Sequence, residues 1–184
     1  MASDEELMAR FRSSGSEDAF EELFRRHGAA AYRTVLSILG DTGAAEDVLQ
    51  ESLLRMVRAR RSYRPGMPFC PWFYTIIRNV CRDEIRRPGR GAPTGSVALA
   101  GWRIAHSPDE SDPCALLERQ EDVRSARRAF ARLPDPEREV LALRIYGEVG
   151  FAEIAAVCGI STEAAKKRAY RGLARLRRAL AQTE

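Results

Sequence analysis

The clearest binding chemistry in this chain lies in one stretch, Phe69–Arg87, with the sequence FCPWFYTIIRNVCRDEIRR. Pro71 suits the first position of a helix, and a helical step of about 100° per residue places Phe73, Ile76, Ile77 and Val80 on one face. Another face collects Thr75, Arg78, Asn79, Arg82 and Arg86, with Trp72 at its edge. Arginines bind phosphates, amides read base edges and aromatic rings stack on unpaired bases. The stretch therefore predicts either a helix that binds nucleic acid or an amphipathic helix with a solvated charged face.

Residue patterns that carry catalysis or bind metals are absent from the sequence. Its four cysteines form no C-x-x-C pair and have no histidine at ligand spacing; they are Cys70, Cys81, Cys114 and Cys158. His27 and His106 are isolated, and no H-E-x-x-H, P-loop or G-x-S-x-G motif occurs. We predict free thiols, no catalytic residue, no metal site and no cofactor, in a protein that is not an enzyme.

Composition indicates an ordinary globular protein with an uneven charge distribution. Of 184 residues, 45% are hydrophobic and 30% are charged, and no apolar run approaches the ~20 residues of a membrane helix. The first residues, MASDEELMARF, contain no apolar secretory segment, which predicts a cytoplasmic protein without membrane insertion. Residues 159–184 hold seven cations and two acids, whereas residues 1–24 hold seven acids and two cations. This polarity favours a nucleic-acid binder with a different surface at its N-terminal end.

Two helices are expected before the stretch around Trp72. The first begins at Ser16 and stops at Gly40, and the second runs from about residue 43 to 61. The predicted buried stripe of the second helix consists of Ala45, Val48, Leu49, Ser52 and Met56. Its other side carries Asp47, Gln50, Glu51, Leu54 and Arg58. Leu54 there indicates a partner surface or a stray exposed leucine. The loop over residues 62–71 either closes the end of a helical bundle or forms a shaped pocket.

The second half of the chain predicts a helix-turn-helix. Residues 88–113 lack helical periodicity, which predicts a linker. Four helices are expected after it, over residues 115–133, 136–146, 151–158 and 162–181. The turn Gly159-Ile160-Ser161 joins a short helix to a long one, as in helix-turn-helix proteins, although a helical hairpin with a solvated basic face fits the same pattern. The inward positions of the long helix are predicted to be Ala165, Ala169, Gly172, Leu173, Leu176 and Leu180. We predict an all-α protein with a domain over 1–87, a flexible linker over 88–114 and a helix-turn-helix domain over 115–184.

Several motifs, in the right order and separation, resemble one family: the bacterial RNA polymerase sigma factors of the extracytoplasmic-function group. The first is Ala45-Glu46-Asp47-Val48-Leu49-Gln50-Glu51, followed by Trp72-Phe73-Tyr74-Thr75-Ile76-Ile77-Arg78-Asn79. The second half matches with Leu133-Pro134, Arg138, Val140, Leu143 and Arg144, then Glu153-Ile154-Ala155 and Gly159-Ile160-Ser161. Where the family usually has T-V-K-S-R-L, this chain has Ala164-Ala165-Lys166-Lys167-Arg168-Ala169, a departure that bears on its duplex contacts.

The resemblance implies an alternative sigma factor that recognises the −35 duplex and the melted −10 element of promoters. The residues implied in −10 binding are Tyr63, Phe69, Trp72, Thr75, Arg78, Asn79, Arg82 and Arg86. Those implied in −35 binding are Ser161, Glu163, Ala164, Lys167, Arg168 and Arg171. Asp47, Gln50, Glu51 and Leu54 are implied in binding core polymerase.

The partners implied by the resemblance are the clamp and flap regions of core RNA polymerase, promoter DNA and an anti-sigma factor. A stand-alone helix-turn-helix regulator is the alternative, and it predicts direct binding to duplex DNA, usually at a palindrome. The sequence shows no dimerisation heptads that would support that alternative. A nucleic-acid-processing enzyme is a third reading, which lacks the acidic metal-binding constellation it would need.

Overall fold

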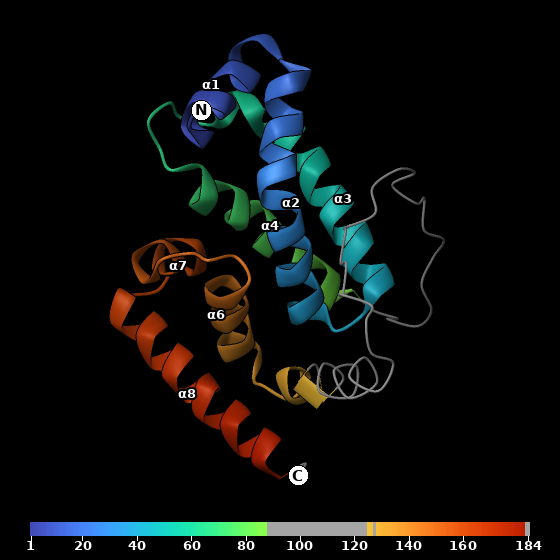
Figure 1. Ribbon diagram of the computed structural model, residues 1–184, viewed down its shortest axis with the longest axis vertical. Helices are drawn as coiled ribbons and strands as arrows, with labels where there is room; N and C mark the ends of the chain where they lie inside the picture. The colour runs from blue at the N-terminus through green and yellow to red at the C-terminus, as the bar shows by residue number, and fades with distance from the viewer. Residues whose placement is uncertain (88–124, 127, 183–184) are drawn as a thin grey trace, which may run out of the picture.

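The computed structural model describes residues 1–87, 125–126 and 128–182, and every regular element within them is helical (Figure 1). The elements are α1 (Asp4–Ser14), α2 (Glu17–Leu39), α3 (Thr42–Ala59), the 3₁₀ turn η1 (Arg60–Ser62), α4 (Phe69–Arg86), α6 (Asp135–Ile145), α7 (Phe151–Cys158) and α8 (Thr162–Ala181). The all-α prediction is confirmed. The predicted linker over 88–114, and most of the helix expected over 115–133, lie outside the described residues.

Local capping chemistry explains where the helices begin and end. The side chains of Ser16, Asp41 and Ser161 accept hydrogen bonds from backbone N–H groups in the first turns of α2, α3 and α8. Gly40 ends α2 in the left-handed conformation, with φ of 74°, which glycine adopts without a steric penalty. Helix α1 was not predicted; Ser3 starts it through a capping box with Glu6.

The N-terminal helices enclose a core whose residues largely match the predicted stripes. All five residues of the stripe expected on α3 are buried. Pro71 lies in the first turn of α4, two residues inside the helix, which begins at Phe69. The loop before α4 closes the end of this bundle, since the side chains of Tyr63 and Phe69 are each only 1% exposed.

Helices α7 and α8 form the predicted helix-turn-helix, and α6 packs against both. Ala165, Ala169 and Gly172 of α8 are buried, whereas Leu180, predicted to face inward, is 40% exposed. Leu180 lies in the last turn of α8. At Gly172, where α8 packs on α6, a Cβ would lie 2.6 Å from Leu141 Cδ1, so a larger residue would force the buried Leu141 side chain to move.

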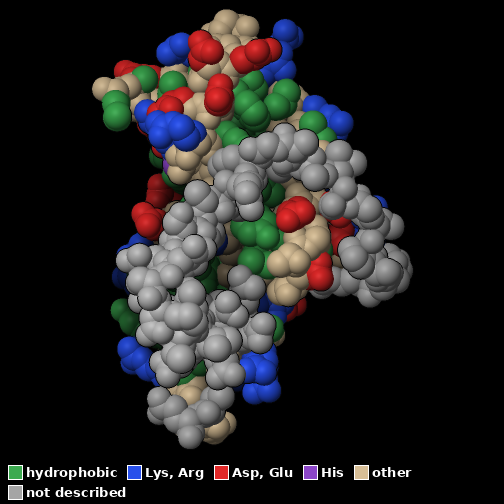
Figure 2. All heavy atoms as spheres, turned by 45° about the vertical axis from the view of Figure 1, so that its right-hand side comes forward, with side chains coloured by type: hydrophobic (Ala, Val, Ile, Leu, Met, Phe, Trp, Pro, Cys, Tyr) green, Lys and Arg blue, Asp and Glu red, His purple; other side chains and the backbone are tan. Residues whose placement is uncertain are grey.

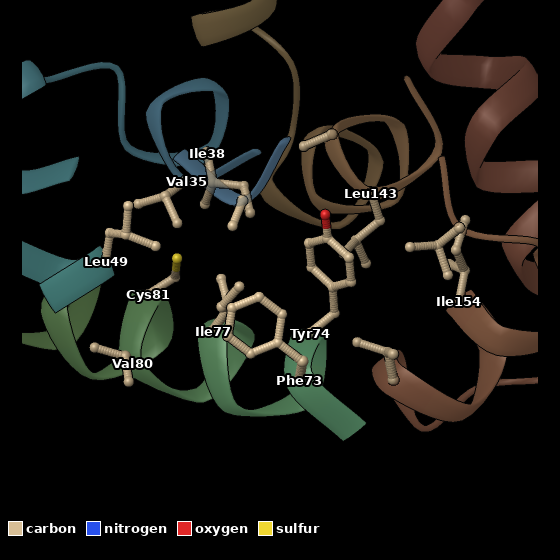
Figure 3. Packing of buried hydrophobic residues seen from close by; sticks show 14 of the residues in the cluster. Val35, Ile38, Leu49, Phe73, Tyr74, Ile77, Val80, Cys81, Leu143 and Ile154 are labelled. Carbon is tan, nitrogen blue, oxygen red and sulfur yellow. The ribbon is translucent and has the colours of Figure 1, made fainter. Parts of the chain in front are cut away.

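The two halves of the chain share one continuous hydrophobic core. Helix α2 packs against α6, and α4 packs against α7. Figure 3 shows Tyr74 of α4 on the side of Leu143 of α6 and Ile154 of α7, while Val80 lies toward Leu49 of α3. Helix α4 therefore contributes to both sides of the core.

Gly147, just after α6, lies against the Tyr74 ring. A Cβ at this position would lie 2.8 Å from the Leu143 carbonyl oxygen and 2.9 Å from Tyr74 Cζ, which is too close for van der Waals contact. Only glycine fits here without moving the backbone of α6 or the ring of α4.

Gly147→Ala is expected to lower the free energy of unfolding by about 1–3 kcal/mol, the usual cost of overpacking a filled core. Urea unfolding followed by circular dichroism measures this change. Gly150→Ala is the matched control in the same loop, because its Cβ would approach only the flexible Glu153 carboxylate, at 3.2 Å. Equal losses in the two variants would show that the Tyr74–Gly147 contact has no special role.

Candidate nucleic-acid and polymerase interface

Helix α4 presents an exposed strip of polar and cationic side chains. Asn79, Arg82 and Arg86 are exposed, and Trp72 is half-buried at the edge of the strip. The Trp72 ring lies edge-on to Tyr63, with 5.2 Å between the ring centroids. Its surroundings fix the position of the indole while part of it stays open to solvent. The strip can therefore offer a stacking surface, an amide and guanidinium groups to a ligand.

Three other residues predicted for −10 binding have different surroundings. Tyr63 and Phe69 are buried, and the Tyr63 hydroxyl donates a hydrogen bond to the Met67 carbonyl. The Thr75 hydroxyl donates to the Pro71 carbonyl at 2.7 Å, within the helix. In this arrangement the buried rings of Tyr63 and Phe69 support the loop, and neither ring is exposed for a base to stack on.

Arg78 forms an ion pair that the sequence pattern did not reveal. Its Nε lies 2.7 Å from Glu139 Oε1 of α6, and the two side chains are only 14% and 15% exposed. A group predicted for the solvated strip is thus held between the two halves of the chain. Removing one partner of such a pair leaves the other charge poorly solvated.

A cavity of about 380 Å³ adjoins this ion pair between α4 and the C-terminal helices. The guanidinium groups among its lining residues belong to Arg78, Arg82, Arg86, Arg138 and Arg168, and the carboxylates to Asp135 and Glu139. Arg168, predicted for −35 binding, therefore lies toward α4.

The face of α3 predicted to bind core polymerase is accessible. Asp47 is exposed and Leu54 is 45% exposed, whereas Gln50 and Glu51 are half-buried. Glu51 accepts a hydrogen bond from Arg55 at 2.7 Å, and Arg55 also reaches Asp83 of α4 at 2.9 Å.

A hollow of about 450 Å³ runs beside this face, between α3 and α4, and is lined in part by Asp47 and Glu51. Arg55 and Arg87 also line this hollow, and they pair with its carboxylates Glu51, Asp83 and Glu84. The exposed Asp47 and Leu54 of the same helix can therefore offer a partner protein a carboxylate and an apolar group.

Helix α8 carries the most concentrated positive charge of the described C-terminal half. Lys167 is exposed, and Lys166 pairs with Glu163 at 3.1 Å. Arg171 Nε lies 3.7 Å from a carboxylate oxygen of Glu137, a buried residue of α6.

The N-terminus of α8 and its outer face stay open to solvent. Ser161 caps the helix by accepting from the Ala164 N–H at 3.2 Å, and Ala164 itself is half-buried. Tyr170, which no sequence motif marks as functional, is 66% exposed on the same helix. On the face shown in Figure 2, the charged side chains at the lower end of the molecule are Lys and Arg.

The thiols in the described part of the chain do not form a nucleophilic centre. Burial raises the pKa of Cys70 to about 11, that of Cys81 to about 12 and that of Cys158 to about 11. Each is a free cysteine and is protonated at neutral pH. Among the described helices, none has the length and apolar character to cross a membrane.

Comparison with known proteins assigns both halves of the chain to related families. Sigma-70 region 2 matches residues 23–91, and Sigma-70, region 4 matches residues 124–176. The RNA polymerase sigma factor CarQ of Myxococcus xanthus is 36% identical over 177 residues, covering 96% of this chain and 97% of CarQ. The ECF RNA polymerase sigma factor SigM of Mycobacterium tuberculosis is 30% identical, covering 97% of this chain and 85% of SigM.

A similar solved structure is that of CnrH in complex with the cytosolic domain of CnrY. It has a TM-score of 0.70 and 26% identity, covering 98% of this chain and 99% of CnrH. A helix-turn-helix combined with a second helical unit that bears a basic strip is consistent with a DNA-recognition protein. The chain belongs to the extracytoplasmic-function sigma factors of RNA polymerase. It is an alternative sigma factor acting in transcription initiation, and this family membership implies a DNA-recognition role without catalysis.

Replacing Glu139 by Leu alone is expected to cost about 1–3 kcal/mol of unfolding free energy, because Arg78 is then left buried without its partner. Arg78→Met alone is expected to cost a similar amount. The double variant should lose less than the sum of the two, and a double-mutant cycle by urea unfolding measures the difference. Strict additivity would mean that the pair is energetically uncoupled.

Proposed function

We propose that α4 and the loop before it bind the melted −10 element of promoters. The carrying observation is the exposed strip of Asn79, Arg82 and Arg86 beside the half-buried ring of Trp72. Trp72 and Asn79 contact extruded bases, by stacking and by hydrogen bonding, and the two arginines bind the phosphates. The buried rings of Tyr63 and Phe69 hold the loop in place, which lowers the entropy lost on binding.

The proposed −35 contacts come from the first half of α8, which lies in the major groove of duplex DNA. Ser161, Glu163 and Ala164 stand at the start of the helix, where base edges are approached, and Lys167 and Arg171 follow on its outer face. The alanine at position 164 allows close approach of the helix to the duplex. Arg168 joins these contacts once the C-terminal helices have moved away from α4, because it lines the cavity between them here.

Core RNA polymerase is the proposed partner of the α3 face. Asp47, Gln50, Glu51 and Leu54 contact its clamp, and residues 115–184 contact its flap. The exposed side chains of Asp47 and Leu54 support this assignment. The proposed domains are residues 1–87 and 115–184, joined by a linker over 88–114. Catalysis then belongs to core polymerase, and the chain acts in the cytoplasm where that enzyme works.

The packed arrangement of the two halves holds two cationic residues of the proposed DNA surfaces between them. Arg78 of the proposed −10 surface is paired with Glu139, and Arg168 of α8 faces the same cavity. We infer that α6–α8 separate from α4 when the chain joins core polymerase. An anti-sigma factor is a further proposed partner, one that holds the halves together; the similar CnrH was solved in complex with a partner, the cytosolic domain of CnrY.

Trp72→Ala and Asn79→Ala are expected to lower promoter opening about tenfold or more, since each base contact contributes about 1–3 kcal/mol. Binding of these variants to core polymerase should be unchanged. Run-off transcription on genomic promoter fragments, together with a core-binding titration, separates the two effects. The control is Glu21→Ala, an exposed position on α2 outside the proposed surfaces. Normal opening by both variants would remove the −10 site from α4, and specific duplex binding without core polymerase would favour a stand-alone regulator.

Lys167→Ala and Arg171→Ala are each expected to weaken the upstream duplex contact by about 1–3 kcal/mol if they read a base edge. Glu137 keeps its partner Arg175, 3.0 Å away, so the Arg171 variant should fold normally. Footprinting of the polymerase holoenzyme over the −35 element measures the loss. Arg177→Ala, an exposed position near the end of the same helix, is the matched control. An unaltered upstream footprint in both variants would show that this face of α8 does not contact the duplex.

A further inference from the structure

A second group of chemically active side chains lies where α1, α2 and the first turn of α4 meet. His27 of α2 stands between Asp4 of α1 and Cys70 of α4. Its Nε2 is 2.6 Å from Asp4 Oδ2, and its Nδ1 is 3.9 Å from Cys70 Sγ. One donor atom from each of the three side chains lies within 4.8 Å of the other two, and all three residues are half-buried. The sequence predicted an isolated histidine and a free thiol, because these positions are far apart along the chain.

Neighbouring groups fix the orientation of the His27 ring. The Phe69 ring packs against it, with 5.1 Å between the centroids. The second carboxylate oxygen of Asp4 accepts a hydrogen bond from Arg26 at 2.8 Å, so the carboxylate is fixed as well. The Phe69 N–H donates to Glu5 Oε1 at 3.2 Å, which ties the start of α4 to α1. Nδ1 therefore faces the Cys70 thiol without any rearrangement of the helices.

This geometry is suited to a metal-binding histidine. A ligating imidazole commonly donates its other N–H to a carboxylate, which fixes the tautomer and raises the basicity of the ligating nitrogen. Thiolate and imidazole are ligands of Zn²⁺ and similar ions, with metal–sulfur distances of about 2.3 Å and metal–nitrogen distances of about 2.0–2.1 Å. In a tetrahedral site these bond lengths place the sulfur and the nitrogen about 3.6 Å apart. The distance between Nδ1 and Sγ is 3.9 Å. A shift of a few tenths of an ångström is therefore enough.

We propose that Cys70 and His27 bind a divalent transition-metal ion of the Zn²⁺ type, with Asp4 as the positioning residue behind the imidazole. Sγ and Nδ1 are the ligands, the thiol proton passes to solvent on binding, and water completes the coordination shell. The negative charges of Asp4, Glu153 and Glu5 act on Cys70. The same charges that disfavour a bare thiolate favour a dication beside it, because the ion reverses the local electrostatic balance.

The site does not depend on the proposed function, but it adjoins the surface that carries it. An ion bound by Cys70 and His27 links the first turn of α4 directly to α2. Phe69 and Trp72 flank that turn, and their ring centroids are 6.4 Å apart. Metal binding would therefore stiffen the end of α4 from which Trp72 projects.

Titration of the full-length chain with Co²⁺, a spectroscopic substitute for Zn²⁺, tests the proposal. All proteins carry Cys114→Ser, because Cys114 lies outside the described residues and its thiol would complicate the spectrum. We expect one equivalent of Co²⁺ to give a thiolate-to-cobalt charge-transfer band that Zn²⁺ abolishes by displacement, with a rise in the melting temperature. Cys70→Ser should remove the band, and His27→Gln should weaken Co²⁺ binding at least tenfold.

Asp4→Asn separates positioning from ligation. It should weaken Co²⁺ binding about 10–100-fold while the charge-transfer band is kept at saturation, and Asp4→Glu should restore part of the affinity. Cys158→Ser, which removes a free thiol elsewhere in the structure, is the control and should bind as the reference protein does. Absence of the band in the reference protein, or a band that survives both Cys70→Ser and His27→Gln, overturns the proposal. If circular dichroism shows that Cys70→Ser does not fold, His27→Gln alone decides.

Discussion

The packing of α4 is the constraint on which the rest of this structure depends. One side of the helix, with Phe73, Ile77 and Val80, completes the core formed with α2 and α3. Another side, with Tyr74 and Arg78, lies against α6 and α7. The polar strip is what remains exposed between these two contacts. The packing of Phe73, Ile77 and Val80 on α2 and α3 fixes the spacing of the strip residues, and that packing does not involve α6–α8.

Much of this arrangement follows from residue patterns within single helices. The buried stripe of α3 and the bounds of α7 and α8 agree with helical periodicity and with the turn at Gly159. Such patterns succeed because each helix buries one face, whatever it packs against. Helix α1 was missed because it is short and strongly acidic at its start. Its apolar residues Leu7, Met8 and Phe11 gain their significance only from docking on the helices that follow.

The features that could not be predicted all join residues distant in the sequence. Arg78 has the spacing of a solvated residue, and only the approach of α6 makes it half of a buried ion pair. Likewise, the sequence allows Tyr63 and Phe69 either to line an open pocket or to be buried at the end of the bundle. Only the tertiary structure shows that both are buried. The contact of Asp4, His27 and Cys70 depends on three helices. The spacing of residues shows which of them share a face of one helix. It does not show which helix packs against that face.

The continuous core between α4 and the C-terminal helices also has a thermodynamic consequence. Under the proposed function, only chains whose halves have separated can bind a promoter, so the apparent affinity equals the intrinsic affinity multiplied by the separated fraction. Each 1.4 kcal/mol of contact between the halves lowers that fraction about tenfold. Under the same proposal, the Tyr74–Gly147 contact and the Arg78–Glu139 pair set a threshold for transcription, although neither Gly147 nor Glu139 touches DNA. Evolution can tune the output of such a regulator through its interior, leaving its promoter sequence unchanged.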